Sequence, residues 1–389
     1  MILFRGLAMC AILTSSAAAQ TITQDNRNQT VTPQMQVLTP HIGGRVQIKK
    51  LGDDKPKGAE SYTHQWPGVY FETGFFGETF VLKFNDTENE YRLLIDDLPP
   101  ITVAQPGQSE ITVSDLANTP HRVRLEKVTE SIWLLGAFEG FYVQTGAKPM
   151  PPAARPRQIE FIGDSDMTGY GLRSDTRICT QEEVRLRSDT QLAYPALVAK
   201  NFDADYQINA ISGRGIVRNF DGIVPDHTIG TMYESILPDH TDIATPYDDP
   251  SWHPQIIFIG LGNNDFFSEL QPQEAWQTRD ALIDTYIAGM VAFVKTLQAR
   301  SPAATMMILW PDQGIMTIEE KARLDRDGQS RLTNAAQKLG LKPLQFISMD
   351  KLTLDALACD YHASANDHRK KAEWLIARIN AQPDLWAGP

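Results

Sequence analysis

A cluster of prolines divides this chain into two parts with different hydrophobic periods. Pro149, Pro151, Pro152 and Pro156 fall within eight positions, and such a run fits neither a helix nor a central strand. We therefore expect a stiff linker over 148–157, with a domain on each side of it. The length of 389 residues agrees with two domains or three.

The part before the linker shows period-two alternation of apolar and polar residues in short runs. Runs such as 79–84, 91–95 and 122–127 are separated by Gly, Pro, Asn and Asp, and no helical pattern interrupts them. This pattern is typical of antiparallel strands, and it predicts a β-sandwich or jelly-roll domain over 36–147. Further runs of the same kind occupy 45–49, 69–72 and 132–135.

The part after the linker, 158–389, alternates apolar strand-like runs with amphipathic helical segments. This order predicts an α/β domain of three layers, in which helices cover both faces of a parallel sheet. In such a sheet the functional site lies beyond the carboxyl ends of the strands. The predicted strands are 159–162, 206–211, 256–261 and 306–310, and the predicted helices are 191–201, 273–300, 318–339 and 365–380.

Residues 1–19 have the pattern of a secretory signal peptide. Arg5 precedes a short apolar run, and small residues stand at Ala17 and Ala19, which places the cleavage site near Ala19. The alternative is an ordinary N-terminal helix, but no cap or amphipathic period supports it. We therefore expect a secreted or periplasmic protein in which residues 20–35 form a loose N-terminal arm. No later run has the length of a membrane span, so no membrane is expected as a partner of the mature chain.

Net charge bears on the partners of the chain, and cysteine content bears on a possible disulfide. The chain has 36 basic and 48 acidic residues, a net charge of −12, and a surface of this sign repels the phosphates of nucleic acid. After signal cleavage only Cys179 and Cys359 remain, in a compartment where disulfides persist. These two cysteines are either bridged or free, and the sequence does not decide between the two.

Groups with catalytic chemistry follow the predicted strands in order. Ser165 stands in a Gly-Asp-Ser turn after the first strand, where a nucleophile would be presented. Gly213 follows the second strand and Asn264 the third, and a backbone N–H and a side-chain amide at these places suit a developing oxyanion. His362 stands beside Asp360 just before the last helix and suits a general base.

Each of these groups also has an ordinary structural explanation. Ser165 and Asn264 suit turns or helix caps, the glycines suit a flexible loop, and His362 suits a solvated loop position. A catalytic role is favoured over these structural explanations, because all of these residues fall in one domain, at strand ends or at the start of the last helix. A metal site is not expected, because His362 and His368 are six residues apart rather than three or four.

These motifs resemble those of the SGNH (GDSL-type) hydrolases, and most closely those of the carbohydrate esterases of family two. The resemblance extends over about 36–380 and implies a jelly-roll domain followed by a three-layer SGNH domain. It also implies a serine esterase without a cofactor that removes acetyl groups from plant polysaccharides such as xylan and glucomannan. The similar segments include 163–165, 193–197, 212–219, 231–232, 262–266 and 359–362, with 66–70 and 121–125 in the first domain.

Carried over residue by residue, the resemblance implies Ser165 as the nucleophile and His362 as the general base. The oxyanion hole would then consist of the Ser165 N–H, the Asn264 side chain and the Gly213 N–H, with Gly215 as the alternative to Gly213. The reaction would pass through an acetyl-enzyme, which a water molecule activated by His362 then hydrolyses.

Departures from the family pattern leave some roles open. Cys359 stands where the family has an Asp three residues before the His, so the third member is Asp360, a backbone carbonyl or no acid at all. Ala363 replaces the usual Pro, and Asn263 replaces the usual Thr. Trp310, at the end of the fourth predicted strand, is either an aromatic platform for a sugar ring or a core residue.

The leading prediction is thus an exported esterase that acts on an acetylated polysaccharide or oligosaccharide. One alternative is a general short-chain esterase of the same fold. Another is a carbohydrate-binding protein with a vestigial esterase site, and the intact set of Ser165, Asn264 and His362 argues against it.

Overall fold

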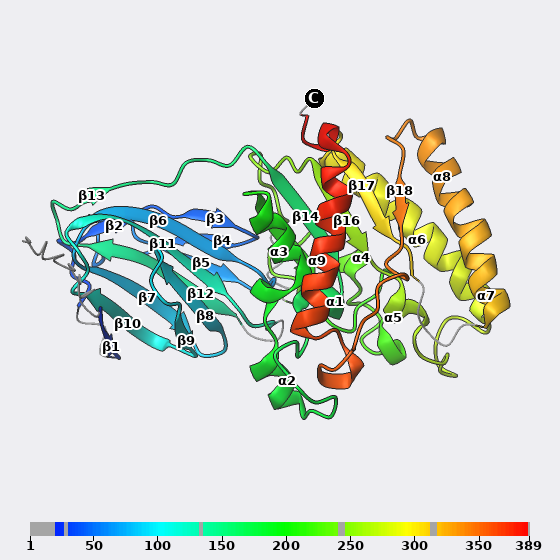
Figure 1. The fold of residues 1–389 in the computed structure, drawn as a ribbon, viewed down its shortest axis with the longest axis horizontal. Coiled ribbons are helices and arrows are strands. Elements are labelled where there is room, and N and C mark those ends of the chain that lie inside the picture. Colours follow the sequence, from blue (N-terminus) through cyan, green and yellow to red (C-terminus); the bar gives the residue numbers. More distant parts are fainter. Residues whose placement is uncertain (1–19, 27–29, 132–134, 240–245, 312–316, 388–389) are drawn as a thin grey trace, which may run out of the picture.

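The chain forms an all-β domain followed by an α/β domain, as the computed structural model in Figure 1 shows. Both predicted fold classes are therefore confirmed. The predicted signal peptide at 1–19 and most of the predicted strand at 132–135 lie outside the described residues. The structure describes residues 20–26, 30–131, 135–239, 246–311 and 317–387.

The first domain is a sandwich of two antiparallel sheets. Burial alternates along its strands, as in the segment Glu90–Ile95, so every second side chain enters the space between the sheets. Phe71 of one sheet packs against Phe138 of the other, with ring centroids 4.8 Å apart. One sheet contains, in spatial order, β1 (Thr21–Asp25), β10 (Gly107–Ser114), β7 (Phe80–Asp86), β12 (Gly136–Val143), β5 (Glu60–His64) and β4 (Gln47–Lys50), with β2 (Gln36–Leu38) beside β12. The other contains β13 (Lys148–Pro149), β6 (Tyr70–Gly77), β11 (Thr119–Lys127), β8 (Glu90–Ile95) and β9 (Ile101–Ala104), with β3 (His41–Gly43) beside β6.

The second domain has a parallel sheet between two layers of helices. Alternate side chains of the central strands point to opposite faces: Ile257 and Ile259 enter one core, whereas Phe258 enters the other. The sheet contains, in spatial order, β15 (Asp205–Ala210), β14 (Gln158–Gly163), β16 (Ile256–Gly260), β17 (Thr305–Leu309) and β18 (Gln345–Ile347). On one face lie α3 (Tyr194–Asn201) and α9 (Ala365–Asn380), and on the other α4 (Ile229–Met232), α6 (Arg279–Arg300) and α8 (Gln329–Lys338). The short helices α1 (Ser165–Thr168), α2 (Gln181–Arg187), α5 (Asn263–Phe266) and α7 (Ile318–Arg323) complete the domain.

The two domains share buried contacts. Trp66 and Tyr70 belong to the β domain but pack into the two cores of the α/β domain. Arg45 of the β domain is fully buried and donates to Glu160 of β14 at 3.2 Å and to Gln207 of β15 at 3.1 Å. The interface is therefore built like a protein interior, and it fixes the β domain against the start of the parallel sheet.

Some predicted segments differ from the observed elements. The predicted loose arm contains β1, which pairs with β10 over Thr21–Asp25 because its backbone groups complete the edge of a sheet. The predicted linker begins inside the β domain, where β13 pairs with β6, and only then runs along the top of the molecule to β14 (Figure 1). Among the described residues, no helix has the length and apolar character needed to cross a membrane.

Candidate active site

The site forms where neighbouring strands of the parallel sheet end side by side. Gly163, at the end of β14, pairs with Ala210 of β15 on one side and with Gly260 of β16 on the other. The segments that follow these strands therefore leave the sheet at the same level. This register brings together residues from three separate motifs, which carry Ser165, Gly213 and Asn264.

Ser165 is presented at the first turn of α1. The Asp164 side chain caps this helix by accepting a hydrogen bond from the Asp166 N–H at 3.1 Å. The Ser165 Oγ lies 2.9 Å from Nε2 of His362, which comes from the loop before α9. The structure thus brings the predicted nucleophile and the predicted base into hydrogen-bond contact, although they are 197 residues apart.

The His362 ring is oriented by a backbone carbonyl. Its Nδ1 lies 3.0 Å from the Cys359 carbonyl oxygen, which can only accept, so Nδ1 carries the proton and Nε2 accepts from Ser165. Burial lowers the pKa of His362 below its usual value of 6.5. The imidazole is therefore neutral at pH 7, as a general base must be.

The Asp360 carboxylate does not contact His362, which corrects its prediction as the orienting acid. Asp360 has a left-handed backbone conformation with φ of 51°, and its Oδ2 accepts a hydrogen bond from the Tyr170 hydroxyl at 2.8 Å. The Tyr170 ring lies against the His362 ring, with centroids 4.2 Å apart. The Asp360 carboxylate therefore acts on His362 through Tyr170 and through its charge.

Two backbone N–H groups remain for an oxyanion. Among the described residues, neither the Ser165 N–H nor the Gly213 N–H has an acceptor, whereas the Gly215 N–H donates to Asn219 Oδ1 at 3.2 Å. Gly213 also has a φ of 75°, a conformation that suits glycine and few other residues. Of the two predicted glycines, Gly213 is thus the one whose N–H is available.

The Asn264 side chain is engaged within the protein. Its Nδ2 donates to Asp164 Oδ2 at 3.0 Å and to the Arg214 carbonyl at 3.1 Å. These bonds tie the nucleophile turn to the loop that carries Gly213. Asn264 as a third oxyanion donor stays a prediction, and this role requires that one of the two bonds opens or is shared.

Asp265 is a residue of the site that the sequence reasoning missed. It is fully buried, and its carboxylate accepts from the backbone N–H groups of Ile216, Val217 and Arg218 at 2.9–3.0 Å. Burial raises the pKa of Asp265 to about 6, although these three donors oppose the shift. It therefore anchors the loop after β15. The sequence offered only the Asn-Asn-Asp run, which an ordinary turn explains equally well.

Carboxylates surround the nucleophile turn. Burial, together with the charge of Asp166, raises the pKa of Asp164 to about 7. Burial alone would raise the pKa of Asp166 as well, but the Lys371 ammonium in contact with it brings that pKa below the usual value. Asp166 therefore stays ionised near His362 and favours the imidazolium that forms when His362 takes up a proton.

Trp310 is a core residue in the structure, so its prediction as a sugar platform is corrected. Only 6% of Trp310 is exposed, its Nε1 donates to Asp325 at 2.9 Å, and its ring packs edge-on against Phe346. Tyr361 is an exposed aromatic residue next to His362; it shows 71% of its surface and lies under the Arg177 guanidinium. Its backbone has a φ of 62°, a left-handed conformation that the sequence does not reveal.

A disulfide joins Cys179 and Cys359, with a Cα–Cα distance of 5.4 Å. It connects the segment before α2 to the residue whose carbonyl orients His362. The backbone of the catalytic loop is also held by Arg177, whose carbonyl accepts from the Asp360 N–H at 2.8 Å.

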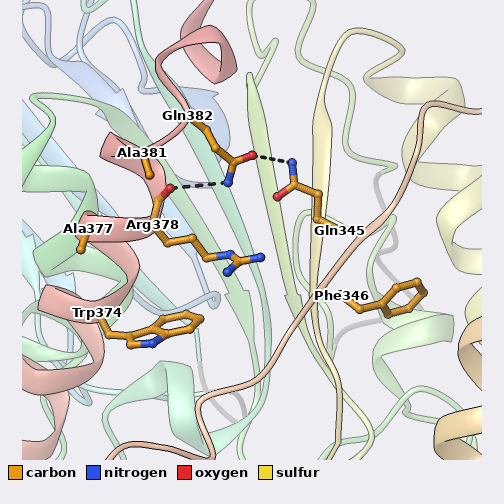
Figure 2. A pocket seen from close by; sticks show the side chains of 7 residues that line it. All are labelled: Gln345, Phe346, Trp374, Ala377, Arg378, Ala381 and Gln382. Carbon is orange, nitrogen blue, oxygen red and sulfur yellow. Dashed lines mark hydrogen bonds between the residues drawn. The ribbon is translucent and has the colours of Figure 1, made fainter.

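A groove between β18 and α9 is separate from this site. It contains Trp374, Arg378 and a hydrogen-bonded pair of glutamines, Gln345 and Gln382, as Figure 2 shows. Gln345 begins β18, whereas the candidate active site lies beyond the other ends of the strands. The groove therefore lies at the opposite edge of the sheet from Ser165.

Comparisons with known proteins agree with this geometry. A family model described as carbohydrate esterase 2 N-terminal matches residues 43–152, and one described as GDSL-like lipase/acylhydrolase matches residues 159–383. An acetylxylan esterase / glucomannan deacetylase of Cellvibrio japonicus is 41% identical over 349 residues, which cover 90% of this chain and 92% of the relative.

Solved structures of carbohydrate esterases are also similar to this chain. A carbohydrate esterase described as displaying divergent catalytic and non-catalytic binding functions matches at 39% identity with a TM-score of 0.80, over 90% of this chain and 100% of that one. A family two carbohydrate esterase from Clostridium thermocellum, at 22% identity and a TM-score of 0.71, covers 89% of this chain and 99% of its own and shares the fold. The chain therefore belongs to carbohydrate esterase family two and is a carboxylic ester hydrolase with a GDSL-type catalytic domain.

Proposed function

We propose that this enzyme removes O-acetyl groups from plant-type polysaccharides, such as xylan and glucomannan, through an acetyl-enzyme on Ser165. The observation that carries the proposal is the 2.9 Å contact between Ser165 Oγ and His362 Nε2 at the strand ends of a carbohydrate esterase. The substrate class is supported by the 41% identical relative, which is named for acetylxylan and glucomannan.

In the first step, Ser165 Oγ attacks the acetyl carbonyl carbon while His362 Nε2 takes the hydroxyl proton. The Cys359 carbonyl accepts the Nδ1–H and stabilises the imidazolium, so the catalytic unit is a Ser–His pair with a backbone acceptor in place of an acid. The N–H groups of Ser165 and Gly213 receive the oxyanion, and one such donor is typically worth about 10²–10³-fold in kcat. The intermediate then collapses: the bond between the acetyl carbon and the sugar oxygen breaks, and this oxygen takes the proton from His362 Nε2 and leaves as the sugar hydroxyl.

In the second step, His362 removes a proton from a water molecule that attacks the acetyl-enzyme. The same two N–H groups receive the second oxyanion, acetate leaves, and the proton returns to Ser165. Every proton that moves passes through His362 Nε2. No metal or cofactor takes part in this mechanism.

The sugar is proposed to bind over Tyr361. This ring is exposed next to His362 and has the flat apolar face on which a sugar ring packs. Tyr361 is therefore proposed as the aromatic platform for a sugar ring, the role that was predicted for Trp310. An acetylated polysaccharide or oligosaccharide is accordingly the expected partner.

Export is part of the proposal. The signal-peptide pattern of residues 1–19 supports it, and a disulfide between Cys179 and Cys359 fits a secreted or periplasmic location, because disulfides persist there.

Two measurements test the proposal together. Acid quenching during turnover of acetylated xylan, followed by peptide mapping, should find one acetyl group on the peptide that contains Ser165. The kcat/KM should be higher for acetylated xylan or glucomannan than for p-nitrophenyl acetate. An acetyl group on another residue would contradict the mechanism, and a preference for the small ester would indicate a general short-chain esterase.

A further inference from the structure

Glu130, a residue of the β domain, reaches the loop that carries Gly213. It stands three positions after β11, and its Oε1 accepts from the Ser212 N–H at 2.7 Å while its Oε2 accepts from the Ser212 hydroxyl at 2.5 Å. The two residues are 82 positions apart and belong to different domains. A carboxylate that takes both donors of one residue fixes the position of its backbone as well as its side chain.

The same contact extends to the nucleophile turn. Because the Ser212 hydroxyl donates its hydrogen to Glu130, its oxygen accepts from Thr168 Oγ1 at 3.0 Å, and Thr168 is the last residue of α1, the helix that begins at Ser165. One carboxylate of the β domain therefore holds the segments that follow β14 and β15. These are the segments that present the two N–H groups assigned to the oxyanion.

The segment that carries Glu130 is itself fixed from both domains. The Val128 N–H donates to the Glu90 carbonyl of the β domain at 2.8 Å, and the Val128 carbonyl accepts from the Thr190 N–H of the α/β domain at 2.9 Å. The buried Lys127 ammonium donates to the Gln65 carbonyl at 2.7 Å. Glu130 thus projects from a segment that is hydrogen-bonded to both domains.

Gly213 needs such a support. A Cβ added to Gly213 would meet no atom within 4 Å, so no side chain packs against this side of the residue. Its left-handed conformation is accessible to glycine but is one of several that glycine adopts. The Gly213 carbonyl is held by the Phe220 N–H at 3.0 Å, whereas its N–H belongs to the peptide unit that it shares with Ser212, so the anchor of Ser212 acts directly on this N–H.

We propose that Glu130 is a positioning residue for the esterase reaction, through which the β domain sets the oxyanion hole by holding Ser212 and hence the Gly213 N–H. This inference rests on the proposed function of Ser165 and Gly213. A misplacement of about 1 Å in a catalytic group can cost about 10²-fold in rate, and loss of an oxyanion donor about 10²–10³-fold. Glu130→Ala should therefore lower kcat by about 10- to 100-fold, with KM for p-nitrophenyl acetate little changed.

The test compares variants in kcat, KM and the affinity for a simple alkyl boronic acid, which forms a tetrahedral adduct on the serine and fills the oxyanion hole. Glu130→Ala should weaken boronate binding in parallel with kcat, and Glu130→Gln, which keeps one acceptor oxygen, should lie between Glu130→Ala and wild type. Ser212→Ala combined with Glu130→Gln should cost less than the sum of the single variants, because both remove the same contact.

Glu126→Gln is the matched control. Glu126 lies near the end of β11, four positions before Glu130, and pairs with Lys200 across the same domain interface at 2.7 Å, whereas the Ser212 N–H and hydroxyl donate to Glu130. This variant should keep wild-type kcat, and the thermal unfolding of each variant shows whether it is folded.

The outcomes separate this inference from the proposed function. One outcome would overturn the role of Glu130 alone. In it, wild-type activity depends on Ser165, but the folded Glu130→Ala and Glu130→Gln variants keep the wild-type kcat and boronate affinity. An equal loss in Glu126→Gln would also overturn it, since the effect would then belong to the interface in general. Wild-type hydrolysis that persists in Ser165→Ala would refute the proposed function itself.

Discussion

His362 has three neighbours that act on it differently. The Cys359 carbonyl accepts its Nδ1–H, Ser165 occupies its Nε2, and Tyr170 covers one face of the ring. The Asp360 carboxylate accepts from Tyr170 and acts on His362 through its charge rather than by a hydrogen bond. The orientation of the base is therefore provided by the backbone of its own loop, and the carboxylate is secondary.

Removing the base should cost far more than removing this carboxylate. We expect His362→Ala to lower kcat by about 10²–10⁴-fold, because proton transfer is lost. Asp360→Ala should cost much less, because the Nδ1 acceptor is untouched. Tyr170→Phe, which removes the donor to Asp360 but keeps the ring on His362, should resemble Asp360→Ala. Hydrolysis of p-nitrophenyl acetate measures all three, and equal losses in Asp360→Ala and His362→Ala would contradict this account.

The pH dependence follows from the buried imidazole. Burial lowers the pKa of His362, so the neutral, active form persists to lower pH than it would in a free histidine. The acidic limb of kcat/KM should therefore have its midpoint below 6.5. Asp164, with a pKa of about 7, titrates nearby, and Asp164→Asn should leave this limb in place. A midpoint above 6.5 in the wild type would show that another group controls the reaction.

At this scale the sequence predicts the residues that follow strands but not their orientations. The contact between Ser165 and His362 could be predicted, because the turn after β14 and the loop before α9 both have recognisable sequence patterns. The direction of the Asp360 side chain depends on its positive φ, and the burial of Trp310 depends on Phe346 and Asp325. Neither property has a local sequence pattern.

Whether a strand of the parallel sheet could be predicted from the sequence depends on its length. The five-residue and longer strands of the parallel sheet follow apolar runs, whereas β18 has only three residues and was not predicted. The helix α2 was missed although Thr180 and Glu183 form a capping box, a signal that is present in the sequence. The predicted helix over 318–339 is interrupted by a π-helical turn at Leu324–Gly328.

The disulfide should stabilise the protein and support the base. It closes a loop of 180 residues, and loss of such a bridge typically costs about 2–5 kcal/mol. Reduction should therefore lower the melting temperature, and it should also lower kcat, because Cys359 supplies the acceptor for His362. Calorimetry and activity with and without reductant measure both effects.

Cys179→Ser provides the control for this prediction. It should start at the lower melting temperature and show no further change with reductant. An unchanged melting temperature in the wild type, after thiol titration has confirmed reduction, would contradict a stabilising bridge.

For the whole molecule, the buried interface should make the two domains unfold together. Arg45 pairs with Glu160 with 0% and 2% of the two side chains exposed, and breaking a buried pair from one side typically costs about 3–5 kcal/mol. Arg45→Ala should lower stability by this amount and keep a single transition. Arg122→Ala, on the exposed surface of β11, should change stability by no more than about 0.5 kcal/mol. Two separate transitions in the wild type would contradict the shared core.

The domain order was predictable from the sequence, but the way in which the domains support each other was not. The contacts that join them connect residues far apart in the chain, such as Arg45 with Glu160 and Glu130 with Ser212. Each of these residues is an ordinary charged or polar residue in its local context. Only the packing of one domain against the other gives them a role.

The most direct test of the central claim is acetate release from acetylated xylan, measured side by side for the mature protein and for Ser165→Ala. We predict that the mature protein releases acetate and that Ser165→Ala, folded to the same extent, releases none above background. Equal release by both proteins would mean that Ser165 is not the nucleophile and would contradict the account.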